Sequence, residues 1–179
     1  MPRHTSFFTV LAVFFTGMAI CTNSLALNTD RKQPLKVEAD KASIHKKTGT
    51  STYTGHVLVR QGSMRIQARK LTVYTRQGKL EKMVARGRPA SFEQRPENRS
   101  GNIKATAKKM TFHADRNIIV FENEARLQQD LNTFTSKRIV YNVNTDTVDA
   151  GEKNGGNRVT ITIQPKSRQQ NRTPVKPLQ

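Results

Sequence analysis

The stretch ARKLTVY, Ala68 to Tyr74, occurs in close variants at three other places in this chain of 179 residues. The variants are ADKASIH (Ala39 to His45), AKKMTFH (Ala107 to His113) and SKRIVYN (Ser136 to Asn142). Each copy begins with a small residue and two charged residues, and then places apolar or small side chains two positions apart. This spacing is typical of a strand with one buried face. The motif therefore predicts a short β-strand that is written four times.

The four copies belong to a longer internal repeat, which is the first feature to look for in a sequence of this kind. A shift of 68 residues without a gap places Ala39 on Ala107 and Tyr53 on Phe121. Within each half, the second copy of the motif follows the first by 29 residues. The chain is therefore predicted to contain two copies of one structural unit.

The residues between the copies continue the same alternation, as in VLVRQGSMRIQARKLTVY, Val57 to Tyr74. Turn signals break these runs at short intervals, at Thr48-Gly49, Gln61-Gly62, Gln77-Gly78 and Asn117. No stretch keeps a helical stripe beyond two turns. The sequence predicts an all-β fold of short antiparallel strands, arranged as a sandwich, a barrel or a stacked roll, with a polar loop at Gln94 to Asn102.

The first residues have the layout of a secretory signal peptide: a basic start at Arg3, the apolar run Phe7 to Cys21, and a small-residue triplet that ends at Ala26. The alternative is a membrane anchor, but the run is shorter than the about 20 apolar residues of a spanning helix. We expect cleavage after Ala26, which removes Cys21, the single cysteine, and with it any disulfide. The expected organisation is a signal peptide at 1–26, one β-domain at 27–165 and a disordered basic tail at 166–179.

The charge of +18 falls only to +17 when Arg3 leaves with the signal peptide. Such a basic exported protein suggests an anionic partner, for which the collective field of residues such as Arg65, Lys70, Arg76, Arg86 and Arg88 matters more than any one of them. No phosphate-binding loop or nucleophile elbow is present. We therefore expect neither an enzyme nor a cofactor.

The histidines and paired acidic residues are better explained as surface residues than as site residues. His45 and His113 are repeat equivalents and each follows an inward residue, so both are expected on the solvent side. His56 has no second ligand at metal-binding spacing in the sequence. Glu122 and Glu124 are expected on an outward face. No metal site is predicted.

The segments ADKASIH, TYTGHVLVRQGSMRIQARKLTVY, GRPASFEQ and AKKMTFHADRNIIVFENEARLQQ resemble those of a known family. In their order and spacing, the chain resembles the lipopolysaccharide-transport bridge proteins of the organic-solvent-tolerance A-like family of Gram-negative bacteria. The resemblance covers about Gln33 to Pro165. Its best marks are T-G-x-V-x-V-x-Q-G (Thr54 to Gly62), the A-x-K strand starts and G-x-P-A-x-F (Gly87 to Phe92).

The resemblance implies a twisted antiparallel β-jellyroll, open at both ends, with an apolar interior. It implies a periplasmic carrier that shields the acyl chains of lipid A and passes lipopolysaccharide from an inner-membrane transport complex to an outer-membrane translocon. Head-to-tail self-association of such domains is also implied. The physical reason for an apolar slot is that each buried CH₂ of a lipid contributes roughly 0.8 kcal/mol.

Alternation places a set of apolar side chains on the inner face of the roll, where ordinary packing and lipid contact are about equally probable for any one of them. The set is Leu35, Val37, Ile44, Val57, Val59, Ile66, Leu71, Val73, Phe92, Phe112, Leu127, Phe134, Ile139 and Tyr141. Leu35, Val37, Phe92 and Phe112 are the preferred lipid contacts.

Two terminal segments are the candidate joining strands between copies, because an open roll exposes unpaired strand edges. They are Leu35, Lys36, Val37, Glu38 and Ala39 at the start, and Arg158, Val159, Thr160, Ile161, Thr162 and Ile163 at the end.

Two other functions remain open from the sequence. One is a membrane-anchored jellyroll protein of the same pathway, which requires a retained helix. The other is an exported nucleic-acid-binding protein, which the positive charge favours. Sparse aromatic residues, the absence of Trp and the even spread of basic residues argue against it, so no nucleic acid is expected as a partner.

Overall fold

The structure is a computed structural model, and it describes residue 30 and residues 33–96, 101–152 and 158–164. One 10-stranded antiparallel sheet makes up this part of the chain. In chain order the strands are β1 (Lys36–Glu38), β2 (Lys41–His45), β3 (Thr50–Gln61), β4 (Met64–Arg76), β5 (Lys79–Gln94), β6 (Ile103–His113), β7 (Ile118–Gln129), β8 (Asn132–Asn142), β9 (Thr147–Ala150) and β10 (Thr160–Thr162). A short 3-10 helix, η2 (Lys46–Thr48), joins β2 to β3. The expected signal peptide and basic tail lie outside the described residues.

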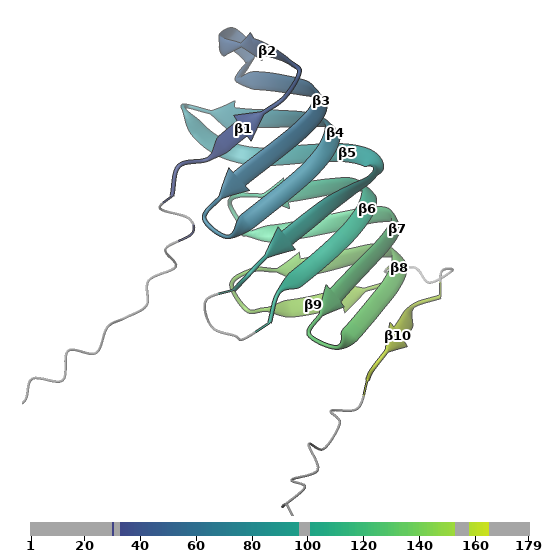
Figure 1. Cartoon of the computed structure of the whole chain (residues 1–179). Helices are drawn as coiled ribbons and strands as arrows, with labels where there is room; N and C mark the ends of the chain where they lie inside the picture. Colours follow the sequence, from purple (N-terminus) through teal and green to yellow (C-terminus); the bar gives the residue numbers. More distant parts are fainter. Residues whose placement is uncertain (1–29, 31–32, 97–100, 153–157, 165–179) are drawn as a thin grey trace, which may run out of the picture.

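The sheet is a meander in which each long strand pairs with the next one along the chain. The spatial order is β1-β3-β4-β5-β6-β7-β8-β10, with β2 also on β3 and β9 also on β8. Figure 1 shows the strands stacked along one axis, with the two ends of the sheet far apart. The predicted all-β antiparallel class is confirmed. In the ranges described, no helix has the length and apolar character needed to span a bilayer.

The long strands bend near the middle, and the prediction that they are short is wrong. β3 to β8 have 11 to 16 residues each. The register shifts within each pair from β3·β4 to β7·β8, for example between Gln67 and Lys70 of β4 and between Thr106 and Lys109 of β6. Such irregularities bend a strand while pairing continues on both sides. The repeated motif therefore begins at the bend and continues along the second half of the bent strand.

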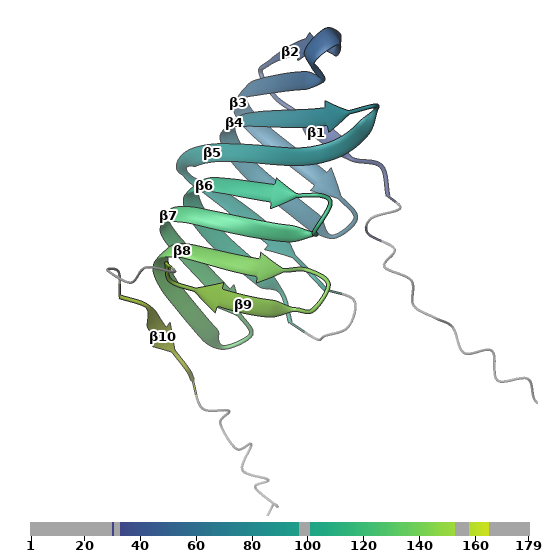
Figure 2. The ribbon, with the colours of Figure 1, turned by 180° about the vertical axis from the view of Figure 1, so that it is seen from behind.

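The bends divide the sheet into two layers, which Figures 1 and 2 show from opposite sides. We call the layer with β1 and β10 the first arm and the layer with β2 and β9 the second arm. The line of bends that joins them is the corner. On the opposite side lie the turns between strands, and there no strand pairing joins the two arms within the described residues. We call this side the seam.

The predicted repeat is visible in the pairing. β1 and β2 both pair with β3 and are separated only by Ala39 and Asp40. A shift of 68 residues places them on the two halves of β6. β1 and β2 are thus one bent strand that is interrupted at its bend.

The predicted turns all lie at the ends of strands or between them. Gln77 and Gly78 connect β4 to β5 with φ of 52° and 75°, which is the left-handed conformation that two-residue hairpins require. Asn117, with φ of 54°, precedes β7. The predicted polar loop falls between the end of β5 and the start of β6, and its residues 97–100 are outside the described ranges.

Candidate functional site

The interior between the arms is built from rows of side chains that run across the strands. In the first arm, the strand register places one inward residue of each strand beside an inward residue of the neighbouring strand. This row is Val37, Val59, Ile66, Phe92, Ala105, Leu127, Phe134 and Ile161. Its members from Val59 to Leu127 are buried, whereas Ile161 at the end of the sheet is 52% exposed.

The second arm contributes two parallel rows. One row is Tyr53, Leu71, Ala85, Met110, Phe121, Ile139 and Ala150. The other, closer to the seam, is Ile44, Ser51, Val73, Met83, Phe112, Ile119, Tyr141 and Val148. The rows make the interior a continuous apolar layer that extends along the length of the sheet.

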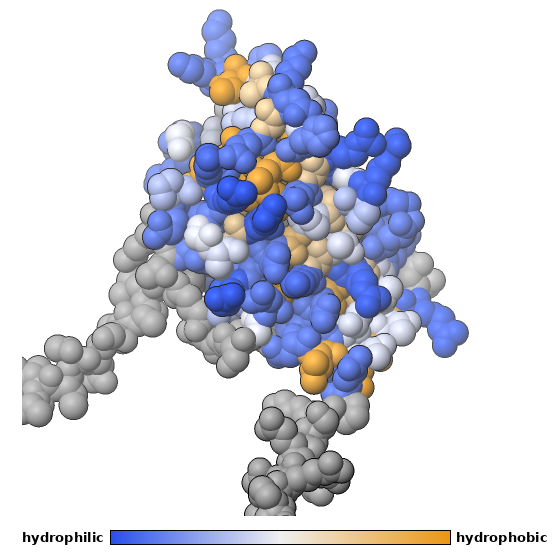
Figure 3. Space-filling view, in the orientation of Figure 1, coloured by the Kyte–Doolittle hydropathy of each residue, from blue (hydrophilic) through white to orange (hydrophobic). Residues whose placement is uncertain are grey.

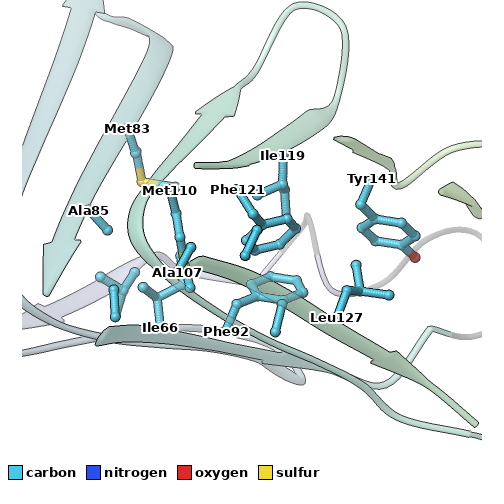
Figure 4. Packing of buried hydrophobic residues seen from close by; sticks show 14 of the residues in the cluster. Ile66, Met83, Ala85, Phe92, Ala107, Met110, Ile119, Phe121, Leu127 and Tyr141 are labelled. Atoms are coloured by element: carbon cyan, nitrogen blue, oxygen red, sulfur yellow. The ribbon is translucent and has the colours of Figure 1, made fainter. Parts of the chain in front are cut away.

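Aromatic side chains join the two arms at the centre of this layer. Phe92 of the first arm and Phe121 of the second arm meet edge to face, with ring centroids 5.9 Å apart and an interplanar angle of 60°. Figure 4 shows the two rings between the layers, with Ile66 and Leu127 beside Phe92. Edge-to-face pairs contribute about 0.5–1.5 kcal/mol beyond their burial.

Small residues line the inside of the corner, where the two arms converge. Ala90, Ala107 and Ala125 have no exposed surface, and Ser136 is 6% exposed. Three of the four motif copies begin at Ala68, Ala107 and Ser136, so the motif's small residue is the inner residue of the bend. A larger side chain at this position has to displace its neighbours, because the small residue already has almost no exposed surface.

A cavity opens at the seam, whereas the space at the centre of the interior is small. The space enclosed between Ile66, Phe92 and Met110 is only about 10 Å³. The seam cavity has a volume of about 190 Å³, and its apolar lining comes from both arms: Met64, Leu80, Phe112, Ile119 and Val143.

Polar groups lie around the seam cavity and further along the seam, and hydrogen bonds connect them. Asp30, before the first strand, also lines the cavity, and its carboxylate accepts hydrogen bonds from the backbone N–H of Ser63 (2.9 Å) and from its hydroxyl (2.5 Å). Further along the seam, the Gln129 amide donates to Asp146 of the opposite arm at 3.2 Å. The cavity therefore has an apolar floor and a polar rim.

The structure places the predicted inner-face residues at three levels of burial. Nine are buried: Val57, Val59, Ile66, Leu71, Val73, Phe92, Leu127, Ile139 and Tyr141. Leu35, Val37, Phe112 and Phe134 are partly buried and pack against this core. Of the four preferred lipid contacts, only Phe112 lines the seam cavity.

Ile44 departs from the expectation of an enclosed inner-face residue. Its register partner Ser51 puts it on an interior row, but the side chain is 61% exposed. β2 is an edge strand whose residues are all exposed, so no further strand of the described ranges covers Ile44. Alternation alone indicates which face a residue occupies and not whether anything lies opposite it.

Sequence reasoning missed several interior residues. Met83, Met110, Ile119 and Phe121 are all buried, and so is Ile103 at the start of β6. The sequence contained a pattern that could have identified two of them as inward residues. Met110 alternates with Phe112 in one motif copy, and the repeat shift places Tyr53 on Phe121.

Both predicted joining segments are at the edges of the sheet. β1 pairs with β3 at one end, and β10 pairs with β8 through Thr160↔Thr135, Ile161↔Phe134 and Thr162↔Thr133 at the other. The exposed residues Val159, Ile161 and Ile163 cluster at β10, where Figure 3 shows apolar atoms at the lower end of the molecule.

The titratable groups form surface pairs. His56 Nδ1 lies 2.8 Å from Asp40 Oδ2, a partner that the linear sequence did not reveal. Glu122 pairs with Lys109 at 2.8 Å, and Glu124 pairs with Lys108. The Lys36 ammonium, which is hydrogen-bonded to Glu38, lowers the pKa of that carboxyl.

His113 is half-buried on the outside of the second arm. Burial, followed by the charge of Arg116, lowers the pKa of His113 below its ordinary value. No group of three or more potential metal ligands occurs among the described residues.

The chain matches proteins of lipopolysaccharide export. A family model described as "LptA/(LptD N-terminal domain) LPS transport protein" matches residues 36–147. Lipopolysaccharide export system protein LptH of Pseudomonas aeruginosa is 33% identical over 154 residues, which are 82% of this chain and 88% of that protein. Lipopolysaccharide export system protein LptA of Escherichia coli (strain K12) is 29% identical over 150 residues, or 83% of this chain and 80% of that protein.

The fold is also that of a solved relative. A crystal structure of P. aeruginosa LptH, described as the LptA-homologous periplasmic component of the lipopolysaccharide transport device, matches with a TM-score of 0.71 at 32% identity. The match covers 76% of this chain and 99% of that one. The antiparallel open sheet is thus the jellyroll-like fold that the sequence predicted, and the chain belongs to the LptA/LptD N-terminal domain family of lipopolysaccharide transport proteins.

Proposed function

We propose that this protein is a periplasmic lipopolysaccharide carrier that holds lipid A acyl chains between its two arms and is not an enzyme. It receives lipopolysaccharide from an inner-membrane transport complex and delivers it to an outer-membrane translocon. The observation that carries the proposal is the set of continuous apolar rows, which run from Val37 and Ile44 at one end of the sheet to Ile161 and Val148 at the other. Membership of the family supports the same ligand.

The acyl chains enter through the seam. Apolar side chains of both arms meet water there, at the cavity lined by Met64, Leu80 and Phe112. The polar rim around Asp30 and Gln94 leaves the sugar headgroup in solvent. Each acyl CH₂ that moves from water into the interior contributes roughly 0.8 kcal/mol.

Loading requires the arms to separate. Ligand pockets usually have volumes of about 300–1,000 Å³, whereas the seam cavity has about 190 Å³. Within the described residues the arms share no strand pairing at the seam, so they open by bending at the corner, which separates Phe92 from Phe121.

Copies of the protein associate head to tail. The exposed apolar residues Ile44 at one end and Val159, Ile161 and Ile163 at the other continue the interior rows beyond the molecule. Edge strands β1 and β10 offer unpaired backbone for strand addition. The predicted signal peptide at 1–26 delivers the domain to the periplasm, and its removal leaves a chain without cysteine.

Crosslinking across the seam tests the proposed entry route. Met64 of the first arm and Leu80 of the second arm are replaced by cysteine, and a bifunctional maleimide joins them in the exported protein, from which Cys21 has been removed with the signal peptide. We expect the joined protein to lose co-elution with lipopolysaccharide, and each single-cysteine variant treated with the same reagent to retain it. Unchanged co-elution of the joined protein rejects entry through the seam.

Photocrosslinking tests the interior as the lipid site. A photoreactive residue at Phe112 or Val37 is expected to form adducts with lipopolysaccharide, whereas the same residue at the outward positions Lys82 and Lys36 is not. Adducts at the outward positions alone contradict the proposal.

A further inference from the structure

The outside of the corner carries a ridge of basic side chains on β4, β5, β6 and β8, on the side of the molecule opposite to the seam. At the bends of β4, β6 and β8, two basic residues follow the small inner residue, and in β5 Arg86 and Arg88 precede the inner Ala90. The bend of β7 carries the acidic residues Glu122 and Glu124 in their place. We call this set the corner ridge: Arg69, Lys70, Arg86, Arg88, Lys108, Lys109, Lys137 and Arg138. Six of its members are exposed, and Lys109 and Arg138 are partly exposed. The two charged residues of the repeated motif therefore lie on the outside of the bend.

Only part of the ridge is neutralised by acidic side chains. Lys108 pairs with Glu124, Lys109 with Glu122 at 2.8 Å, and Lys137 with Glu152 at 3.6 Å. Arg69, Lys70, Arg86 and Arg88 form no ion pair with the carboxylates of the described ranges. The stretch of the ridge over β4 and β5 is therefore a field of unpaired positive charge.

The strand register places like charges directly opposite each other along the ridge. Lys70 of β4 is paired with Arg86 of β5, and Arg86 is paired with Lys109 of β6. Neighbouring strands are about 4.8 Å apart, and like charges at opposite positions destabilise a sheet. The Lys70–Arg86 pair therefore does not favour folding, whereas a bound polyanion removes the repulsion between these two cations.

A surface hollow adjoins the ridge on the first arm. It has a volume of about 820 Å³ and is lined by Gly87, Arg88, Pro89, Thr106, Lys108, Glu124, Arg126 and Thr135. Arg88 and Arg126 supply guanidinium groups, which bind carboxylates through two parallel hydrogen bonds. The hydroxyls of Thr106 and Thr135 add neutral donors and acceptors. Charged donors with hydroxyls around an open hollow suit an acidic sugar.

We propose that the corner ridge and its hollow bind an acidic polysaccharide that lies along the long axis of the molecule. The ridge crosses the neighbouring strands β4, β5 and β6 and resumes at β8, beyond Glu122 and Glu124 of β7, so it presents cations from four strands to an extended chain of carboxylates. The ridge and the lining of the hollow contain no aromatic residue, and stacking on such residues is the usual basis of single-stranded nucleic-acid binding. No large apolar residue belongs to either, so nothing there inserts into a membrane. The site lies opposite the seam and is separate from the proposed lipid entry.

The proposal is tested by measuring the binding of a sugar polymer to two variants, each of which loses three cations. The whole chain is expressed and the exported protein is purified. The ridge variant carries Lys70→Gln, Arg86→Gln and Arg88→Gln, and the control variant carries Arg60→Gln, Arg65→Gln and Lys79→Gln, so both lose three charges. None of the six residues belongs to an ion pair within the described residues, and thermal unfolding confirms that each variant is folded. Alginate, a polymer of uronic acids, is the probe, and its affinity is measured by calorimetry at physiological salt.

We expect the ridge variant to bind alginate roughly tenfold more weakly, and the control variant to change by less than about twofold, because distant exposed charges are screened. The single substitution Arg126→Gln is expected to weaken binding as well, since Arg126 lines the hollow. Equal losses in the ridge and control variants mean that net charge alone attracts the polymer, and overturn the proposal. A DNA oligomer or an anionic phosphatidylglycerol vesicle that binds more tightly than alginate, with its binding lost in the ridge variant, also overturns it. Retained lipopolysaccharide co-elution by the ridge variant is the expected sign that the two sites are independent.

Discussion

At the scale of single residues, position in the bent sheet determines burial more than residue type does. Leu127 and Leu131 are four positions apart, yet Leu127 is fully buried on the first-arm row and Leu131 is 49% exposed in the turn between β7 and β8. Val59 and Ile44 differ in the same way, since Val59 is fully buried and Ile44 is exposed. Core and surface residues of equal hydrophobicity therefore make different contributions to stability.

Leu127→Ala is expected to lower the free energy of unfolding by about 2–5 kcal/mol, because it removes a fully buried side chain and leaves a cavity. Leu131→Ala, the matched control, is expected to change it by less than about 0.5 kcal/mol. Urea unfolding followed by circular dichroism measures both. Similar losses in the two variants contradict the burial described here.

His113 is expected to make stability depend on pH. Burial lowers the pKa of His113 in the folded protein, so the unfolded chain binds a proton more readily. The contribution of neutral His113 to the free energy of unfolding is fully present above its pKa in the unfolded chain, about 6.5. This contribution is lost as the pH falls from there through the lower pKa of His113 in the folded protein.

Thermal unfolding between neutral and mildly acidic pH checks this effect. His113→Asn is expected to decrease the fall in midpoint temperature over that range, whereas His45→Asn, at an exposed position, leaves the fall unchanged. An unaltered pH profile in His113→Asn contradicts the assignment.

At the scale of elements, the bend explains the composition of the repeated motif. The small residue faces the crowded inside of the corner, the two charged residues face outward, and the alternating residues that follow return to the interior of the second arm. The bend is visible in the sequence as a break in alternation, since Ala68 and Leu71 are three positions apart where the other inward residues are two apart.

Ala107→Leu is expected to destabilise the protein by about 1–3 kcal/mol, because a larger side chain inside the corner overpacks the contact between the arms. Lys108→Leu, at the next position and on the outside of the bend, is expected to cost less than about 1 kcal/mol. Denaturant titration of both variants measures the difference. If the order of the two effects is reversed, the assignment of inside and outside is wrong.

At the scale of the whole molecule, the sheet is open at both ends, because within the described residues β1 and β2 pair only with β3, and β9 and β10 pair only with β8. The interior rows therefore finish in exposed apolar residues, Ile44 at one end and Ile161 and Ile163 at the other. An arrangement of this kind favours end-to-end association, since a second copy covers the exposed edge and continues the rows.

Thr160→Pro together with Thr162→Pro is expected to abolish self-association, because proline cannot donate the backbone hydrogen bonds that strand addition needs. Gln164→Pro, just after β10, is the control and is expected to associate like the parent protein. Light scattering during size-exclusion chromatography over a range of concentrations measures the oligomers. Oligomers of unchanged size in the double variant reject β10 as the joining strand.

The sequence by itself determined the strand class, the repeat, the turns and the facing of most inner residues, because period-two alternation and turn residues are local properties of the chain. It also indicated the family through the order and spacing of its motifs. The tertiary structure alone decided that strand halves join through bends into two arms, that Phe92 meets Phe121 across them, and that Ile44 remains uncovered. It also aligned cations that are far apart in the sequence into one corner ridge. These features depend on pairing between strands and on what lies opposite each face of the sheet. The pattern of residues within one strand determines neither of them.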